Sequence, residues 1–130
     1  MLEAGIRGEQ SVAVTAENTA KTMGSGTLDV FATPALVALA EKTCWMSVAA
    51  ALDEGCGTVG TRLDVSHDSA TPVGMQVWAE AEVTAVDGRK LTFSAVMYDD
   101  AGEVGRATHE RFIIQNEKFQ KKADAKKAAE

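Results

Sequence analysis

The sequence predicts a single α+β domain in which a curved antiparallel sheet wraps one long central helix. Three observations predict this architecture. The chain has 130 residues, a usual length for one domain, and 45% of them are hydrophobic, enough to build a core. An apolar stretch over residues 33–52 has the composition of a buried helix. After it, residues 58–115 alternate between apolar and polar side chains, which is typical of strands.

The segments before the long helix are short. Residues 11–16, SVAVTA, alternate in polarity and predict a brief edge strand. Residues 18–27 are polar and contain glycine, which indicates a loop or a single helical turn. Residues 28–32 follow as a brief extended piece. The predicted N-terminal contribution to the sheet is therefore one short strand.

The helix is predicted to run from Thr33 to Leu52. Thr33 is a good N-cap residue, and Pro34 fits the first helical position, where its missing N–H has no partner to lose. Glu41 and Lys42 are the only charged residues in this stretch. A helix that is apolar on nearly every side is buried, so we expect the sheet to surround it.

Tight turns divide the alternating region into consecutive strands. The turn signals are residues 68–72, the Asp-Gly pair at 87–88 and residues 100–102. The strands expected between them are 58–67, 75–86, 91–97 and 104–115. Consecutive antiparallel strands form a meander whose apolar face needs a cover, and the long helix is the only candidate. This layout is that of a hotdog fold.

Three large side chains point away from the predicted core. The alternation places Trp78, Val96 and Tyr98 on the outer face of the sheet. Large apolar residues on such a face favour a second protein surface against it. We therefore expect a homodimer, with a higher oligomer left open.

Charge and composition exclude several classes of protein. The formal net charge is −6, whereas a nucleic-acid-binding protein carries a basic face. No apolar run approaches the length of a membrane span, and the first residues, MLEAGIRGEQ, do not resemble a secretory signal. Cys44 and Cys56 are too few for a disulfide framework and lack the spacing of a metal site. We expect a cytoplasmic protein without nucleic-acid or membrane partners.

The C-terminal end differs from the rest of the chain in charge. Residues 118–130 hold five lysines against two acidic residues, so the acidic charge is concentrated in the preceding part. Apart from Phe119, only alanines are apolar here, and the segment cannot bury much surface. We predict one hotdog domain over residues 1–119 and a basic, solvated helix over 120–130. Docking of an anionic ligand is the alternative role for this tail.

Glu41 is the residue whose chemistry disagrees most with its setting. It lies two turns into the apolar helix, on the stripe that contains Val37, Trp45 and Val48. A buried carboxylate is strongly destabilising unless it is paired or protonated. Two interpretations stay open, a functional carboxylate inside a site and a helix-edge glutamate that reaches solvent.

Two further polar residues, His67 and Thr33, are candidates for a site, whereas His109 is not. His67 ends an apolar strand face, and is either a core histidine with a satisfied hydrogen bond or an acid–base group close to Glu41. Besides its expected role as N-cap, Thr33 has a hydroxyl placed where the free N–H groups of the helix can hold a carbonyl oxygen. His109 is expected to be solvated or paired with the neighbouring Glu110.

Other common catalytic motifs do not occur. Gly24-Ser25-Gly26 is too short for a phosphate-binding loop and is not followed by the required lysine. The sequence also contains no G-x-S-x-G motif. These absences exclude P-loop NTPase and serine-hydrolase chemistry.

Three segments resemble the fluoroacetyl-CoA thioesterase family of hotdog proteins. They are FATPALVALAEKTC (31–44), TVGTRLDVSHDSATPVG (58–74) and GRATHERFIIQNEKF (105–119). The resemblance extends over most of the chain, from about Gly5 to Phe119. The spacing of Thr33, Glu41 and His67 agrees with that of the family's catalytic residues.

The resemblance implies a role for each of five residues. Thr33 would hold or polarise the acyl group, Glu41 would act as nucleophile or general base, and His67 would be the general acid/base. Gly60 and Arg111 would steady the substrate. Thioester hydrolysis with these groups requires no metal, and the only coenzyme expected is the coenzyme A of the substrate. The resemblance also implies a site shared between the two subunits of a homodimer.

The sequence indicates the reaction more clearly than it indicates the acyl group of the substrate. In the family, an aromatic lid precedes the threonine, whereas residues 21–30, KTMGSGTLDV, are rich in glycine and contain no aromatic residue. We therefore expect an acyl-CoA thioesterase for a small or short-chain acyl group, without a role in fluoroacetate detoxification. Hydratases of this fold use a D-x-x-x-x-H motif, which does not occur here. A protein that binds acyl-CoA or a related metabolite without hydrolysing it is the alternative.

Overall fold

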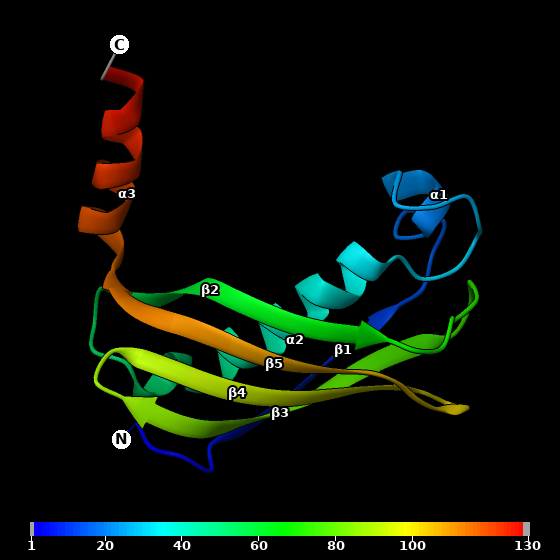
Figure 1. The fold of residues 1–130 in the computed structure, drawn as a ribbon, viewed down its shortest axis with the longest axis horizontal. Helices are drawn as coiled ribbons and strands as arrows, with labels where there is room; N and C mark the ends of the chain where they lie inside the picture. The colour runs from blue at the N-terminus through cyan, green and yellow to red at the C-terminus, as the bar shows by residue number, and fades with distance from the viewer. Residues whose placement is uncertain (1, 129–130) are drawn as a thin grey trace.

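In the computed structural model, which describes residues 2–128, five antiparallel strands form one curved sheet around a helix (Figure 1). The strands are β1 (Arg7–Ala13), β2 (Cys56–His67), β3 (Gln76–Asp87), β4 (Lys90–Asp99) and β5 (Gly102–Gln115). The helices are α1 (Ala20–Met23), α2 (Thr33–Val48) and α3 (Asn116–Asp124), with 3₁₀ turns at Ala49–Ala51 and Ala125–Ala128. The strand order β1-β3-β4-β5-β2 makes β1 and β2 the sheet edges. This is the predicted hotdog layout.

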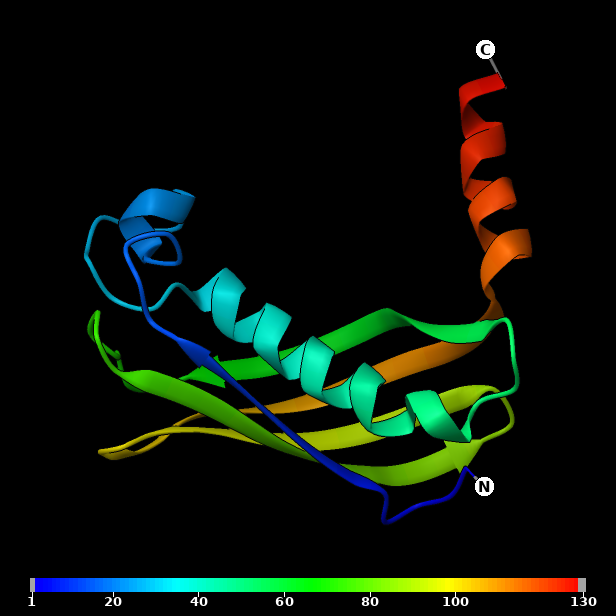
Figure 2. The same ribbon diagram turned by 180° about the vertical axis from the view of Figure 1, so that it is seen from behind.

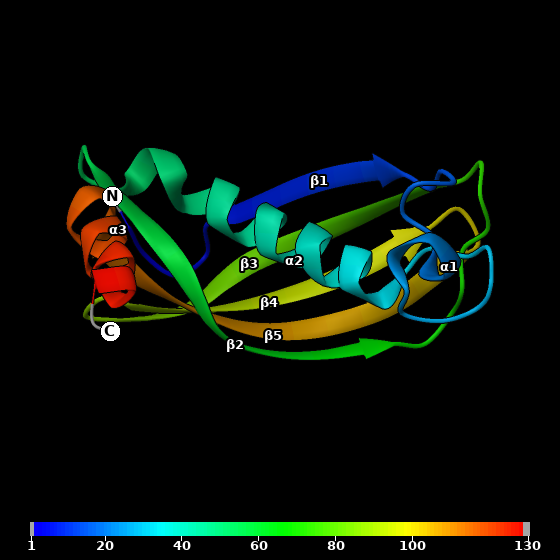
Figure 3. The ribbon, with the colours of Figure 1, turned by 90° about the horizontal axis from the view of Figure 1, so that it is seen from above.

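Helix α2 lies along the concave face of the sheet, between the two edge strands (Figures 2 and 3). Leu36, Ala40, Cys44 and Val48 recur at the helical period and belong to the buried core. The inward residues of β3 and β4 alternate as predicted, and those that are buried are Val77, Ala79, Ala81, Val83, Leu91, Phe93, Ala95 and Met97. Because a slip of one residue would expose this whole set, the apolar pattern fixes the register of both strands.

The ends and the outer side of α2 differ from the prediction. Ala32, and not Thr33, is the N-cap residue, so Thr33 is the first helical residue and its hydroxyl does not cap the helix. The α-helix ends at Val48, and a 3₁₀ turn continues the chain from there. Burial on nearly every side is wrong for the single chain, because Trp45 and Met46 are 43% and 39% exposed. The sheet curves around one side of the helix and leaves the other side uncovered.

The two edge strands also differ from the prediction. β1 begins at Arg7, before the predicted start at residue 11, and pairs with β3. β2 pairs with β5, and the register between them shifts between Gly60 and Arg62. Thr61 is therefore the extra residue of a β-bulge, a device that bends a strand and redirects its neighbouring side chains.

The outer face of the sheet carries the aromatic pair expected from the alternation. Trp78 of β3 and Tyr98 of β4 are half-buried and stack with their ring centroids 5.7 Å apart. Val96 lies half-buried on the same face. The pair is thus partly shielded from solvent within one chain.

Helix α3 projects away from the sheet at the end of β5 (Figure 1). It begins at Asn116, before the predicted start of the basic tail, and all its residues are exposed. The domain boundary predicted after residue 119 therefore falls inside this helix. Within residues 2–128, no helix is long and apolar enough to cross a membrane.

Candidate active site

Thr33 and His67 meet where the N-terminus of α2 approaches the end of β2. Thr33 Oγ1 lies 2.7 Å from His67 Nδ1, at hydrogen-bond distance. The other ring nitrogen, His67 Nε2, is buried and has no hydrogen-bond partner among the described residues. Burial lowers the pKa of His67, against a smaller opposing effect of the Asp68 carboxylate. The ring is therefore neutral at pH 7 and presents one unused nitrogen.

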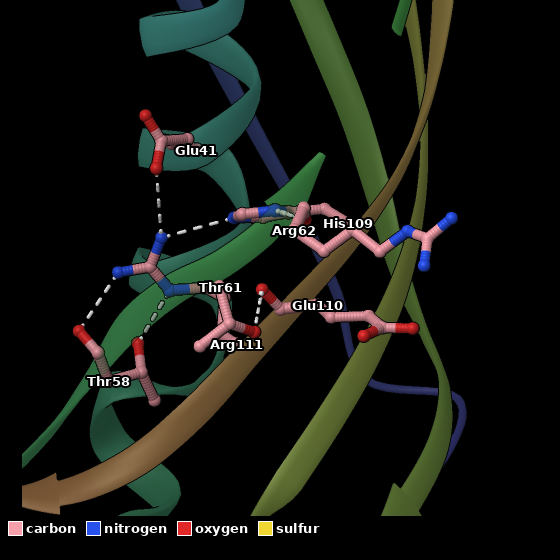
Figure 4. Close-up of polar contacts among 7 residues, drawn as sticks. All are labelled: Glu41, Thr58, Thr61, Arg62, His109, Glu110 and Arg111. Atoms are coloured by element: carbon pink, nitrogen blue, oxygen red, sulfur yellow. Dashed lines mark hydrogen bonds and ion pairs between the residues drawn. The ribbon is translucent and has the colours of Figure 1, made fainter. Parts of the chain in front are cut away.

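Arg111 forms the centre of a second cluster, which lies beside Glu41, about two helical turns along α2 from Thr33 (Figure 4). It points inward from β5 and is only 6% exposed. Its Nε donates to Thr58 Oγ1 at 2.7 Å and its Nη2 donates to the Thr58 carbonyl at 2.9 Å. Its Nη1 lies 3.5 Å from Glu41 Oε2. Burial lowers the pKa of Arg111 and the Glu41 carboxylate opposes this effect, so the guanidinium keeps its charge.

His109 fixes the other side of the Arg111 guanidinium. The ring is 1% exposed, its Nδ1 lies 2.8 Å from the Arg62 carbonyl, and its Nε2 lies 3.1 Å from Arg111 Nη1. A guanidinium can only donate, so Nε2 accepts and Nδ1 carries the proton that goes to the carbonyl. The ring is neutral, in agreement with a pKa lowered by burial. The expected solvation or pairing with Glu110 is wrong, because the β5 alternation turns His109 inward.

Gly60 provides the space that Glu41 occupies. A Cβ atom at this position would lie 2.7 Å from Glu41 Oε2 and 3.1 Å from His109 Cε1. Gly60 is directly before the β-bulge and pairs with Arg111 across the strands. A larger residue would therefore displace the Glu41 carboxylate from its position beside Arg111.

Glu41 is only partly buried, whereas one of the two interpretations of the sequence placed its carboxylate inside a site. Its side chain is 41% exposed in the single chain, because it lies at the edge of α2 toward β2 and not under the sheet. Within the described residues, no hydrogen bond joins Glu41 to His67. The eight residues from Thr33 to Glu41 correspond to about 12 Å along the helix axis. One chain thus holds two separate halves, Thr33 with His67 and Glu41 with Arg111.

Cys44, which lies beside this second cluster, is inert. It is fully buried, and burial raises the pKa of its thiol to about 12. A thiol in this state is not a nucleophile. Cys44 is therefore a core residue, in agreement with its apolar surroundings in the sequence.

The sequence did not indicate a role for Thr58, and the expected position of His109 was wrong. Thr58 holds Arg111 through both its hydroxyl and its carbonyl, a role that no spacing rule reveals. His109 had a usable signal, because it shares the β5 alternation with Ala107 and Arg111, both of which are buried. The three alternate positions belong to one inward face.

Comparisons with known proteins identify the family. The family model described as fluoroacetyl-CoA-specific thioesterase (FlK) matches residues 14–117. The fluoroacetyl-CoA thioesterase of Streptantibioticus cattleyicolor is 41% identical to this chain over 101 residues, which are 78% of this chain and 73% of the relative.

Solved structures agree with this result. A structure of FlK is 33% identical, with a TM-score of 0.91 over 97% of this chain and 98% of its own. A hot-dog-like protein from Thermanaerovibrio acidaminovorans has 20% identity and a TM-score of 0.85, over 95% of this chain and 91% of its own, and shares the fold. The chain therefore belongs to the fluoroacetyl-CoA-specific thioesterase family and is a thioester hydrolase with the hotdog fold.

Proposed function

We propose that the chain hydrolyses the thioester of a small or short-chain acyl-CoA at a site formed by Thr33, Glu41 and His67, beside Gly60 and Arg111. The observation that carries the proposal is the 2.7 Å contact between Thr33 Oγ1 and His67 Nδ1, which leaves His67 Nε2 free. Thioester hydrolysis needs an attacking water or carboxylate, donors for the developing oxyanion, and a group that handles protons. These residues supply all three, and the only coenzyme involved belongs to the substrate.

Thr33 and the first turn of α2 are proposed to hold the thioester carbonyl. The first N–H groups of a helix have no intrahelical partner and carry partial positive charge. A carbonyl oxygen placed there gains donors as it becomes an oxyanion. Thr33 adds a hydroxyl at the same end of the helix, fixed by His67.

Glu41 is proposed to attack the carbonyl carbon or to activate water. As nucleophile, its carboxylate forms a bond to the acyl carbon, the C–S bond breaks, and water deprotonated by His67 Nε2 later cleaves the mixed anhydride. As general base, Glu41 takes the proton of the attacking water, and the CoA thiolate leaves directly. A thiol has an ordinary pKa of about 8.5, so the thiolate is a competent leaving group in both cases. Arg111 orients the carboxylate from 3.5 Å away.

The separation of the two halves supports a shared site in a homodimer. A carbonyl held at Thr33 is about two helical turns from the Glu41 of the same chain, roughly 12 Å along the axis. We infer that Glu41 of one protomer faces the Thr33–His67 pair of the other. Such a dimer would also cover the exposed Trp45 and Met46 on the uncovered side of α2.

The acyl group is proposed to be small. The segment that precedes Thr33 presents the exposed side chains of Met23 and Leu28 and has no aromatic residue before Phe31, which is buried. Acetyl-CoA is a natural first candidate, since a solved structure of a threonine-to-serine mutant of FlK is a complex with it. Both cysteines are free, which suits the reducing cytoplasm where we place the protein.

The test is release of free thiol from a panel of acyl-CoAs, read with a thiol-reactive dye. The panel includes acetyl, fluoroacetyl, malonyl, phenylacetyl and longer acyl groups, and compares wild type with Glu41→Gln. We expect turnover of a small member and a fall of at least about a hundredfold in Glu41→Gln. Glu110→Gln is the matched control, because Glu110 points away from the site and pairs with Lys90 (Figure 4).

Each other outcome has a definite meaning. A strong preference for fluoroacetyl-CoA would contradict the inference drawn from the missing aromatic lid. Turnover that survives in Glu41→Gln would remove Glu41 from the mechanism. No turnover of any member, by a folded protein that still binds CoA, would make it an acyl-CoA-binding protein.

A further inference from the structure

A basic groove lies between the projecting helix α3 and the end of β5. It has a volume of about 500 Å³, and its lining includes Arg89, Lys118 and Lys122 but no carboxylate. A groove lined by three cations and no carboxylate stands out in a chain whose net charge is −6. Lys118 and Lys122 are four residues apart, so they lie on one side of α3. The groove thus concentrates positive charge on an otherwise acidic molecule.

Among the described residues, the cations of the groove form no ion pair, whereas several basic residues elsewhere do. Lys90, Arg106 and Lys121 pair with Glu110, Glu103 and Glu117 respectively. In the described part of the chain, Lys118 and Lys122 form no ion pair, and Arg89 lies over the Phe112 ring instead, 5.2 Å from its centroid. The groove cations are therefore available to an external anion.

The groove also offers an aromatic surface. Phe119 lines it between the two lysines and is 43% exposed. An exposed ring beside cations provides a platform on which a nucleic base stacks while the cations hold its phosphates. This combination fits a nucleotide better than a bare phosphate ion.

A second hollow shares the lining residue Cys56 with the groove and is lined also by Thr58, the residue that contacts Arg111. This hollow has a volume of about 230 Å³ and is lined by Trp45, Cys56, Gly57, Thr58 and Asn116, among others. From Gly60 to Cys56 the strand covers about 13 Å, a distance that an extended pantetheine arm can follow.

We propose that the basic groove binds the phosphorylated nucleotide of the acyl-CoA substrate, while the pantetheine arm follows the hollow beside Thr58 toward Arg111. The proposal rests on the proposed function, and it gives the basic helix a role in substrate binding. Contacts between ammonium or guanidinium groups and phosphate are charge-assisted and depend on salt. The nucleotide does not take part in the chemical step, so the groove acts on affinity alone.

The test compares two double variants on two substrates. Lys118→Glu/Lys122→Glu reverses the charge of the groove, and Lys126→Glu/Lys127→Glu makes the same change outside it, later in the same basic tail. The substrates are the best acyl-CoA of the panel and the same acyl group on pantetheine, which lacks the nucleotide. For the groove variant we expect the KM for acyl-CoA to rise at least about tenfold, with kcat and the pantetheine ester unaffected. The control should change the KM less than about twofold.

The remaining outcomes separate this proposal from the proposed function. An unchanged KM in the groove variant, or equal effects of the two double variants, would overturn the groove as a nucleotide site. Loss of the oligomer in the groove variant, seen by light scattering, would make the groove a contact between copies of the chain. If wild type hydrolyses no acyl-CoA, titration calorimetry with adenosine bisphosphate still tests the groove, since binding that only the groove variant loses would support it and absence of binding would overturn it.

Discussion

At the scale of single residues, the buried ring of His109 links protonation to the folded state. It accepts from Arg111 and donates to the Arg62 carbonyl only while it is neutral. Burial lowers its pKa from the ordinary value of 6.5, so below pH 6.5 the unfolded chain binds more protons than the folded chain. The contribution of this ring to stability is therefore complete above pH 6.5 and is lost as the pH falls through its lowered folded-state pKa.

We expect the free energy of unfolding, measured with urea between about pH 8 and about pH 5, to decrease toward the acid side. His109→Gln should reduce this decrease, because an amide can accept and donate but does not titrate. His67→Gln is the matched control, and its effect should be smaller because His67 is only half-buried. The same pH dependence in wild type and His109→Gln would assign the loss of stability to other titrating groups, namely His67 or carboxylates.

The packing around Gly60 predicts a loss of activity without a loss of fold. In Gly60→Ala the new Cβ would lie 2.7 Å from Glu41 Oε2, and the flexible, half-exposed glutamate would move away from Arg111. We expect kcat to fall about tenfold while the free energy of unfolding changes by less than about 1 kcal/mol. Steady-state kinetics and urea unfolding of the same preparation check both values. An unchanged kcat would show that the position of Glu41 beside Arg111 is not required.

At the scale of elements, the geometry at the start of α2 indicates whether Thr33 has a structural or a functional role. A threonine at the N-cap contributes about 1 kcal/mol through its hydroxyl, but here Ala32 is the N-cap and Thr33 Oγ1 contacts His67. The β-bulge at Thr61 likewise serves the site and not the core, because it bends β2 next to Gly60.

We expect Thr33→Val, which keeps the shape of the side chain, to lower kcat by about tenfold or more and to change the thermal unfolding midpoint only slightly. Thr33→Ser keeps the hydroxyl and serves as the control, with most of the activity retained. If the valine variant lost stability in the amount of a missing cap and kept its kcat, the hydroxyl would be structural.

At the scale of the whole molecule, the inferred shared site makes the activity a property of two chains. Glu41→Gln and His67→Ala are each expected to be inactive alone. In a heterodimer of the two, one site would combine His67 of the first chain with Glu41 of the second and would be intact. Its other site would carry both changes.

We therefore expect activity to return when the two inactive variants are unfolded, mixed in equal amounts and refolded together. Random pairing makes half of the dimers heterodimers, each with one intact site, so about a quarter of the wild-type activity should return. Refolding each variant by itself is the control. If the mixture stays inactive although heterodimers form, the site lies within one chain.

Several features of the protein followed from the sequence alone. Apolar residues that recur about every 3.6 positions predicted α2, and those that recur every 2 positions predicted the strands that contain Val77 and Phe93. This works because burial of one face constrains side chains that are near neighbours in the chain. The residue pattern itself indicated Thr33, Glu41 and His67 as candidates. The family resemblance, which the comparisons confirm, added Gly60 and Arg111.

The tertiary structure decided what depends on distant segments. The pairing of β2 with β5 turns His109 toward Arg62, and the packing of α2 against the sheet brings Arg111 to a glutamate 70 positions earlier in the chain. The hydroxyl of Thr33 contacts a histidine and does not cap its own helix, since β2 ends beside it. Local patterns record which face of an element is buried, but register and packing between remote elements determine which polar groups meet there.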